Sequence, residues 1–223
     1  MSNCLLETVI CEPEGVANAS VIWMHGLGAD GHDFLSIVPQ LQLPSSLKVR
    51  YIFPHAPVRP VTIQGGLSCR AWFDIFDLNR LDREDTVGLA RSERAIHALV
   101  EQEVAAGILP HRILLVGFSQ GGAIAQYTAL RSSYRLAGVV GLSAYLPLAN
   151  QVQPTTNNQS LPVFLAHGSY DPVLPIQLGS RSVSILQALG CVVDWHEYSM
   201  EHAVCEKEIA DLSHWMAVSG FKD

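Results

Sequence analysis

One serine of the chain lies in a pattern that can present a nucleophile. Ser119 is the centre of Gly117-Phe118-Ser119-Gln120-Gly121, which matches Gly-x-Ser-x-Gly between an apolar run and a helical pattern. The turn that this pattern predicts leaves no room for a Cβ atom at its flanking positions, hence the glycines. It holds the serine hydroxyl at the N-terminus of a helix, where backbone N–H groups can stabilise an oxyanion. The alternative is a glycine-rich packing turn in which Ser119 only caps the helix.

An acid and a histidine follow the serine in the order that a catalytic triad on this turn requires. Asp171 lies in a turn after the apolar run 162–166, and His202 lies in the loop after residues 192–198. Because the C-terminal ends of parallel strands meet at one edge of a sheet, we expect the three side chains to converge there. His202 would take the proton of Ser119, and Asp171 would orient the imidazole. Other aspartates are poorer candidates for the acid because of their positions in the chain: Asp74, Asp77 and Asp194.

The loop after residues 20–24 supports two interpretations. In this architecture the second N–H of an oxyanion hole comes from a loop after an early strand, which predicts Leu27 opposite Gln120. The same loop, Gly26-Leu27-Gly28-Ala29-Asp30-Gly31, also matches the dinucleotide fingerprint Gly-x-Gly-x-x-Gly. That fingerprint needs an acidic residue about 20 positions later, and residues 46–53 contain none. A nicotinamide-dependent oxidoreductase is therefore the weaker hypothesis.

The elements that must position these residues alternate along the chain. Short apolar runs predict strands near residues 5–10, 20–25, 48–53, 112–117, 137–142, 162–167 and 191–198. Helical patterns occupy residues 32–40, 86–107, 120–132, 176–190 and 203–218. The alternation predicts an α/β fold, with a mostly parallel central sheet and helices on both faces. Because the chain has 223 residues and neither a linker nor a repeat, we expect one domain over residues 1–223.

Composition and charge argue against several other classes of protein. The chain is 48% hydrophobic with a net charge of -7, and its Lys and Arg residues do not cluster, which argues against nucleic acid as a partner. No apolar run approaches a membrane span, and the N-terminus lacks the charged and apolar parts of a secretory signal. Ser2 stands where myristoylation requires glycine. Five cysteines, none at metal-binding spacing, predict reduced thiols and a cytoplasmic protein.

Five motifs stand in order along nearly the whole chain. They are Met24-His25-Gly26-Leu27-Gly28-Ala29-Asp30-Gly31, Phe53-Pro54-His55-Ala56-Pro57-Val58-Arg59-Pro60-Val61-Thr62, Arg70-Ala71-Trp72-Phe73-Asp74, Gly117-Phe118-Ser119-Gln120-Gly121-Gly122 and His167-Gly168-Ser169-Tyr170-Asp171-Pro172-Val173-Leu174-Pro175. Together they resemble the carboxylesterase / acyl-protein thioesterase (lysophospholipase-like) family of small α/β-hydrolases. The ordered set is far more specific than any one motif.

The resemblance implies the α/β-hydrolase fold and a complete site. Its catalytic triad would be Ser119, Asp171 and His202, and its oxyanion hole the backbone N–H groups of Leu27 and Gln120. It also implies an apolar acyl pocket formed in part by residues 63–76, with no metal and no cofactor. Two aromatic residues of that segment are the candidate substrate-binding residues, with burial in the core as the alternative: Trp72 and Phe73. A homodimer is compatible with the resemblance.

The sequence thus predicts a serine hydrolase that cleaves carboxylic esters or thioesters of apolar acyl groups through an acyl-enzyme. Small soluble esters, lysophospholipids and acylated proteins all remain as substrates. The alternatives are a non-catalytic binding protein on a hydrolase scaffold and the nicotinamide-dependent oxidoreductase. Residues 145–160 are polar and interrupted by prolines, and they form either a lid or a plain surface loop.

Overall fold

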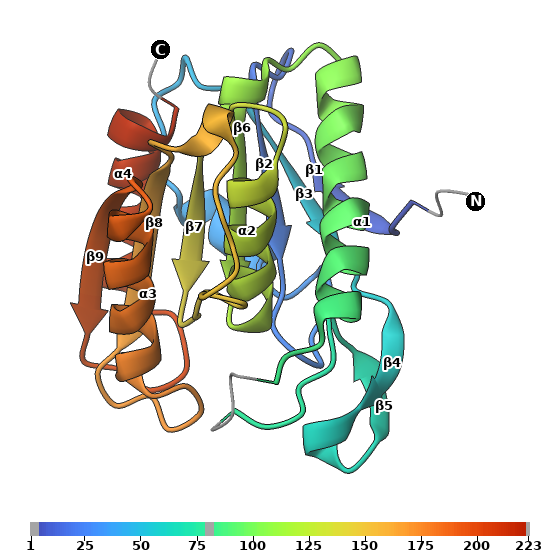
Figure 1. The fold of residues 1–223 in the computed structure, drawn as a ribbon. Helices are drawn as coiled ribbons and strands as arrows, with labels where there is room; N and C mark the ends of the chain where they lie inside the picture. The colour runs from blue at the N-terminus through green and yellow to red at the C-terminus, as the bar shows by residue number, and fades with distance from the viewer. Residues whose placement is uncertain (1–4, 79–82, 222–223) are drawn as a thin grey trace.

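A central sheet dominates the computed structural model of the protein, which describes residues 5–78 and 83–221 (Figure 1). Seven strands follow the order β1-β3-β2-β6-β7-β8-β9. The pair β1–β3 is antiparallel, and the other pairs are parallel. The strands are β1 (Thr8–Cys11), β2 (Ala19–Met24), β3 (Val49–Pro54), β6 (Ile113–Phe118), β7 (Gly138–Leu142), β8 (Pro162–Gly168) and β9 (Val192–Tyr198). The predicted α/β fold with a mostly parallel sheet is confirmed.

Side chains of the strands alternate between two cores, so both faces of the sheet are covered. In β6, Ile113 and Leu115 belong to the first core and Leu114 and Val116 to the second. The first core is closed by α1 (Thr86–Ala105), α2 (Gln120–Arg131) and α3 (Ile176–Ala188), which lie in front of the strands in Figure 1. The second is closed by α4 (Glu206–Trp215) and the 3₁₀ helix η1 (Leu35–Gln40). The loops at the C-terminal edge of the sheet therefore start from strands that are packed on both faces.

The helix expected at residues 32–40 is shorter than predicted. The segment forms only η1, which contains Pro39 and has no side-chain cap hydrogen bond at Phe34. Proline removes an amide donor inside a helix, so a longer α-helix is disfavoured here. Ile37 is nevertheless buried, so this short helix still contributes to the second core. Further short turns are η3 (Pro110–Arg112), η4 (Thr156–Asn158) and the π-helical turn η5 (Met216–Gly220).

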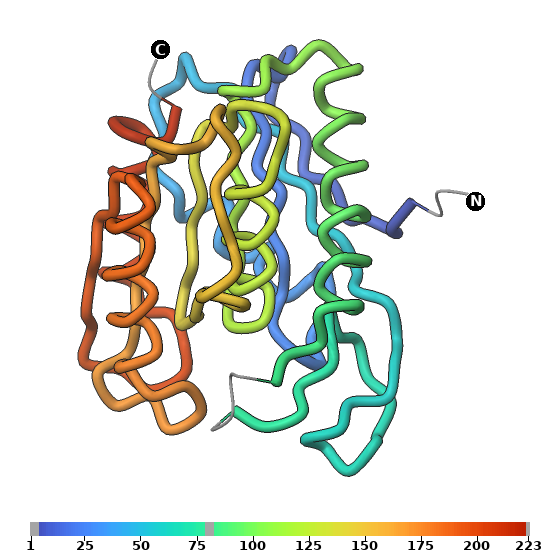
Figure 2. The backbone as a smooth tube through the Cα atoms, in the orientation of Figure 1, coloured from blue at the N-terminus to red at the C-terminus, as the bar shows by residue number. Residues whose placement is uncertain are grey.

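A two-stranded hairpin was not expected from the sequence. It consists of β4 (Val58–Val61), the 3₁₀ turn η2 (Thr62–Gln64) and β5 (Leu67–Arg70), and it pairs in antiparallel register. Gly65 and Gly66 close it with positive φ angles of 68° and 82°, where glycine is favoured. The backbone trace shows the hairpin projecting beyond the C-terminal ends of the sheet strands (Figure 2). Within the part of the chain that the structure describes, none of the helices combines the length and apolarity of a membrane span.

Candidate active site

Ser119 lies on a tight turn between β6 and α2, as its sequence pattern predicts. Its backbone has φ 53° and ψ -119°, a conformation that costs a residue other than glycine about 1–3 kcal/mol. A Cβ atom on Gly121 would lie 2.2 Å from the carbonyl oxygen of Met24, and one on Gly117 would meet the backbone of Gly121 equally closely. The two glycines therefore let α2 and β2 pack tightly against a turn that presents the half-buried serine.

Three side chains expected to converge form a continuous hydrogen-bonded chain at this edge of the sheet. Ser119 Oγ lies 2.9 Å from His202 Nε2, and His202 Nδ1 lies 2.6 Å from Asp171 Oδ2. An ionised Asp171 accepts the Nδ1 proton, which leaves a lone pair on Nε2 facing the serine hydroxyl. In this tautomer His202 is ready to accept the proton of Ser119.

The Asp171 carboxylate is held by its own turn and lies beside a second histidine. Oδ1 accepts hydrogen bonds from the N–H groups of Val173 and Leu174, both at 2.8 Å. His167 lies at the end of β8, donates from Nε2 to the Leu174 carbonyl at 2.8 Å and lies 3.4 Å from Asp171 Oδ2. Burial lowers the pKa of His167, so its ring stays neutral. His167 thus fixes the turn from which Asp171 reaches His202.

The loop after β2 passes beside the serine. His25 Nε2 accepts a hydrogen bond from the Ala56 N–H at 3.0 Å, so His25 Nδ1 donates to the Gly26 carbonyl at 2.7 Å. Burial lowers the pKa of His25, in keeping with a neutral ring. A Cβ atom on Gly26 would lie 3.6 Å from the Cβ of Ser119. The loop that carries Leu27 is therefore fixed at the side of the nucleophile.

The side chain of Gln120 joins the serine turn to the segment after β5, a role that the sequence did not indicate. Its Oε1 accepts from the Trp72 N–H at 2.8 Å, and its Nε2 donates to the Phe73 carbonyl at 2.7 Å. Trp72 Nε1 donates in turn to the His25 carbonyl at 2.9 Å. Trp72 and Phe73 are buried, so the structure places these candidate substrate-binding residues in the core beneath the loops. Their hydrogen bonds to Gln120 and His25 hold the loops of the site together. The cavity beside Asp171 is lined by other side chains.

That cavity has a volume of about 840 Å³. Pro172 and Val173, which directly follow Asp171, form part of its wall. Other apolar lining residues come from η2, the loop after β7 and α3, and they include Ile63, Leu146, Leu148, Leu178 and Ile185. Glu84 and Arg181 add charged groups to the lining. Polar side chains also line the cavity, among them Asn150, Gln151, Gln177 and Ser182. Of the expected pocket segment, residues 63–76, Ile63 lines this cavity.

The segment 145–160 lines the cavity with its first half and is tied down along its second. Glu84 Oε2 accepts a hydrogen bond from the Leu148 N–H at 2.7 Å. Burial raises the pKa of Glu84, although this hydrogen bond opposes the shift. In the second half, Asn158 Nδ2 donates to the Ser132 carbonyl at the end of α2, at 2.9 Å. These contacts favour a surface loop over a lid.

The remaining candidates from the sequence lie in other surroundings. Asp74 accepts two hydrogen bonds from Thr62, so its carboxylate stabilises the hairpin. Asp194 pairs with His196 at 3.1 Å within β9. The glycine-rich loop after β2 leads into η1, whereas a dinucleotide site requires a helix that opens at the glycines. Four of the cysteines are free thiols, namely Cys11, Cys69, Cys191 and Cys205. Cys4 lies outside the described residues.

The sheet, its helices and the serine turn define the class of α/β-hydrolases, and the comparisons with known proteins specify the family. The chain belongs to the phospholipase/carboxylesterase family, which it matches over residues 6–219. It is 37% identical to acyl-protein thioesterase 1 of Gibberella zeae over 209 residues, 89% of each chain. It is 38% identical to acyl-protein thioesterase 1 of Neurospora crassa, over 89% of this chain and 85% of that one.

A solved structure agrees with these relatives. The crystal structure of Zea mays acyl-protein thioesterase 2 superposes with a TM-score of 0.85 at 31% identity, covering 96% of this chain and 99% of that one. The family resemblance expected from the motifs is therefore confirmed, and the protein is an esterase/thioesterase hydrolase. The hypotheses of a non-catalytic binding protein and of an oxidoreductase are set aside.

Proposed function

We propose that the protein hydrolyses thioesters and esters of apolar acyl groups, with Ser119 as nucleophile, His202 as general base and acid, and Asp171 as the orienting carboxylate. The observation that carries this proposal is the unbroken hydrogen-bonded chain from Asp171 through His202 to the serine hydroxyl. A serine hydroxyl is a poor nucleophile at neutral pH unless a base is in contact with it. The hydrogen bond from Asp171 holds His202 in the tautomer that can act as this base.

The reaction proceeds through an acyl-enzyme. Ser119 Oγ attacks the acyl carbonyl carbon while its proton passes to His202 Nε2. The tetrahedral intermediate then collapses, and His202 returns the proton to the leaving thiol or alcohol. Water then attacks the carbonyl carbon of the acyl-enzyme while it gives a proton to the same nitrogen. The second tetrahedral intermediate collapses, the carboxylic acid leaves, and His202 returns the proton to Ser119 Oγ. Asp171 stabilises the imidazolium in both halves.

The backbone N–H groups of Leu27 and Gln120 are the proposed oxyanion hole. Gln120 is the first residue of α2, so its N–H has no acceptor within the helix. The positive end of the helix dipole favours a negative charge at that point. The residue after Leu27, Gly28, donates its N–H to the Arg70 carbonyl at 2.9 Å, which fixes this part of the loop. Donors that are held in place before reaction stabilise the developing charge most effectively.

Acylated proteins are the substrates that we propose, with the acyl chain in the cavity beside Asp171. The apolar wall formed by Leu146, Leu148 and Leu178 suits a fatty acyl chain. The relatives named as acyl-protein thioesterases cover about nine tenths of this chain. In this proposal the protein that carries the acyl group remains outside the cavity while the acyl chain is bound.

The test compares wild-type protein and Ser119→Ala on two substrate series, p-nitrophenyl esters from acetate to palmitate and S-acylated peptides of the same chain lengths. We expect both activities to fall about 10⁴-fold or more in the variant, since loss of a triad nucleophile has effects of that size. The chain-length optimum of the wild type measures the depth of the cavity. Ser184→Ala changes an exposed serine of α3 and serves as the matched control.

A fluorophosphonate probe gives a second readout that does not depend on the substrate. It should label the wild type and Ser184→Ala, and it should fail to label Ser119→Ala. Comparable hydrolysis by wild type and Ser119→Ala would show that the nucleophile is another residue. Hydrolysis of the esters without cleavage of the S-acylated peptides would leave the serine mechanism intact and move the substrate to oxygen esters.

A further inference from the structure

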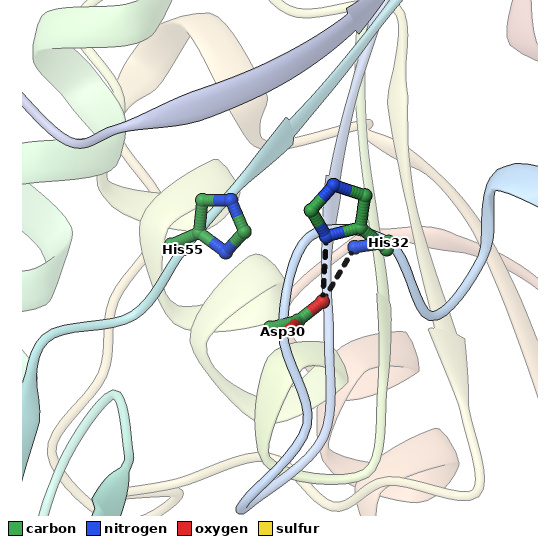
Figure 3. A group of neighbouring side chains, drawn as sticks. All are labelled: Asp30, His32 and His55. Atoms are coloured by element: carbon green, nitrogen blue, oxygen red, sulfur yellow. Dashed lines mark hydrogen bonds and ion pairs between the residues drawn. The ribbon is translucent and has the colours of Figure 1, made fainter.

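Two loops bring three side chains with metal-ligating atoms together outside the triad. Asp30 and His32 follow β2, and His55 follows β3. One ligand atom from each residue lies within 4.8 Å of the others. Figure 3 shows the three side chains grouped, with the Asp30 carboxylate beside the His32 ring. A carboxylate oxygen and two imidazole nitrogens form a donor set that suits zinc and neighbouring transition metals.

The backbone holds these side chains in place without an ion. The Gly31 N–H donates to His55 Nδ1 at 3.1 Å, which links the two loops. Gly31 packs so closely on the end of β3 that a Cβ atom there would lie 2.5 Å from the Phe53 carbonyl oxygen. Asp30 Oδ1 accepts from the His32 N–H at 2.8 Å and lies 3.1 Å from His32 Nδ1. These contacts keep the three ligand groups near one another although they come from two separate loops.

We propose that Asp30, His32 and His55 bind a divalent transition-metal ion, with Zn²⁺ as the representative ion. Three protein ligands and one water complete the tetrahedral coordination that zinc prefers. His32 is largely exposed, so its ring can turn toward the ion at little cost. His55 already has a lone pair on Nδ1, because that atom accepts the Gly31 N–H. Binding through this nitrogen exchanges one neutral hydrogen bond for a metal bond.

The proposed site is separate from the reacting groups. It shares no residue with Ser119, His202 or Asp171, so the expectation of a reaction without a metal is unaffected. Asp30 and His32 lie on the loop that carries Leu27, and the ion would tie that loop to the end of β3. The sequence does not reveal this site, because zinc motifs are found by short spacings between pairs of cysteines or histidines. Here His55 lies in a different loop from Asp30 and His32.

The test is a competition titration of the purified full chain, with Zn²⁺ alone as ligand and a chromogenic chelator as reporter. We expect His32→Ala to weaken binding at least about tenfold, because even outer partners of metal ligands have effects of this order. His97→Ala, which removes a histidine on α1 far along the chain, is the matched control and should bind as the wild type does. Unchanged far-UV circular dichroism confirms that both variants are folded, and His32→Gln repeats the test with a similar volume.

Co²⁺ distinguishes this site from binding at the cysteines. Coordination by Asp and His gives d–d bands without the charge-transfer band of a cobalt–thiolate bond. Visible d–d bands in the wild type that disappear in His32→Ala would support the proposal. Equal Zn²⁺ affinity in wild type and His32→Ala would overturn it, as would a thiolate band that persists in His32→Ala. None of these readouts depends on hydrolysis, so the proposal stands or falls independently of the proposed triad.

Discussion

The serine turn and the β4–β5 hairpin lie at the same end of the molecule, yet they are built in opposite ways (Figure 1). At the turn, a Cβ atom on Gly117 or Gly121 would come within 2.2 Å of backbone atoms. In the hairpin, the glycines at positions 65 and 66 have no heavy atom within 4 Å of that position. Leu67 in β5 is 71% exposed, whereas every residue of β2 is buried. One region is fixed by close packing, whereas the other is held by its strand pairing and by the hydrogen bonds from Thr62 to Asp74.

This difference separates the proposed reacting groups from the surfaces that we propose select a substrate. Ser119, His202 and Asp171 are each placed by a strand end or loop that packs on the central sheet, where small displacements are costly. The hairpin is more exposed, so changes of sequence are better tolerated there. We expect substitutions at the turn to change the reaction or the fold, and substitutions in the hairpin to change neither strongly.

The largest effect is expected from Asp171→Asn. The amide oxygen can still accept from the N–H groups of Val173 and Leu174, so the turn should keep its shape. The amide NH₂ would then face His202 Nδ1, which forces the proton onto Nε2 and removes the base from Ser119. We expect kcat to fall about 10⁴-fold, with a urea-unfolding midpoint close to that of the wild type. A variant that retains kcat within tenfold of the wild type would remove Asp171 from the proposed triad.

A pair of glycine substitutions compares the two regions directly. In Gly121→Ala the new methyl group would meet the Met24 carbonyl oxygen at 2.2 Å, and we expect a loss of about 3 kcal/mol or more in the free energy of unfolding. In Gly66→Ala the methyl group meets open space, and only the positive φ of 82° is unfavourable, which costs about 1–2 kcal/mol. Urea unfolding measures both. An equal or larger loss in Gly66→Ala would contradict the contrast between packed and free turns.

The sequence was sufficient for the parts of the molecule in which a single residue type is required. The Gly-x-Ser-x-Gly turn and the order of Asp171 and His202 were predictable, because steric limits and strand ends dictate them. The parallel strands were predictable because burial on both faces gives continuous apolar runs. The hairpin was not, since β4 contains Pro60 and lacks a regular alternation of apolar residues.

Contacts between distant segments could not be predicted from the sequence. Aromatic residues serve both cores and binding sites, so only the structure shows that Trp72 and Phe73 are buried under the loops. Nothing in the sequence indicated that the Gln120 side chain would bond to the backbone of those two residues. Asp30 and His55 likewise meet only because β2 and β3 are neighbours in the sheet. Pairings of this kind depend on topology and not on local pattern.

A third type of position is a buried carboxylic acid that belongs neither to the serine turn nor to the hairpin. Glu208, in the first turn of α4, is fully buried, and its Oε2 accepts from the Cys205 N–H at 3.3 Å. Its Oε1 has no hydrogen-bond partner within the described part of the chain. Burial raises the pKa of Glu208 from 4.5 to about 8. The folded protein therefore keeps this proton at pH values where the unfolded chain has released it.

The smallest effect we predict follows from that proton. Between pH 4.5 and about 8 the folded state binds more protons at Glu208 than the unfolded state does, so the free energy of unfolding falls as pH rises. Over pH 6 to 8 we expect this group to remove about 1–3 kcal/mol. Glu208→Gln has no proton to lose, so its stability should fall less over the same range, and Glu206→Gln, an exposed change on the same helix, should behave as the wild type. Urea unfolding at several pH values measures all three proteins. Parallel pH profiles for the wild type and Glu208→Gln would mean that this buried carboxyl releases its proton in the folded protein as readily as in the unfolded chain, and would overturn the predicted effect of burial.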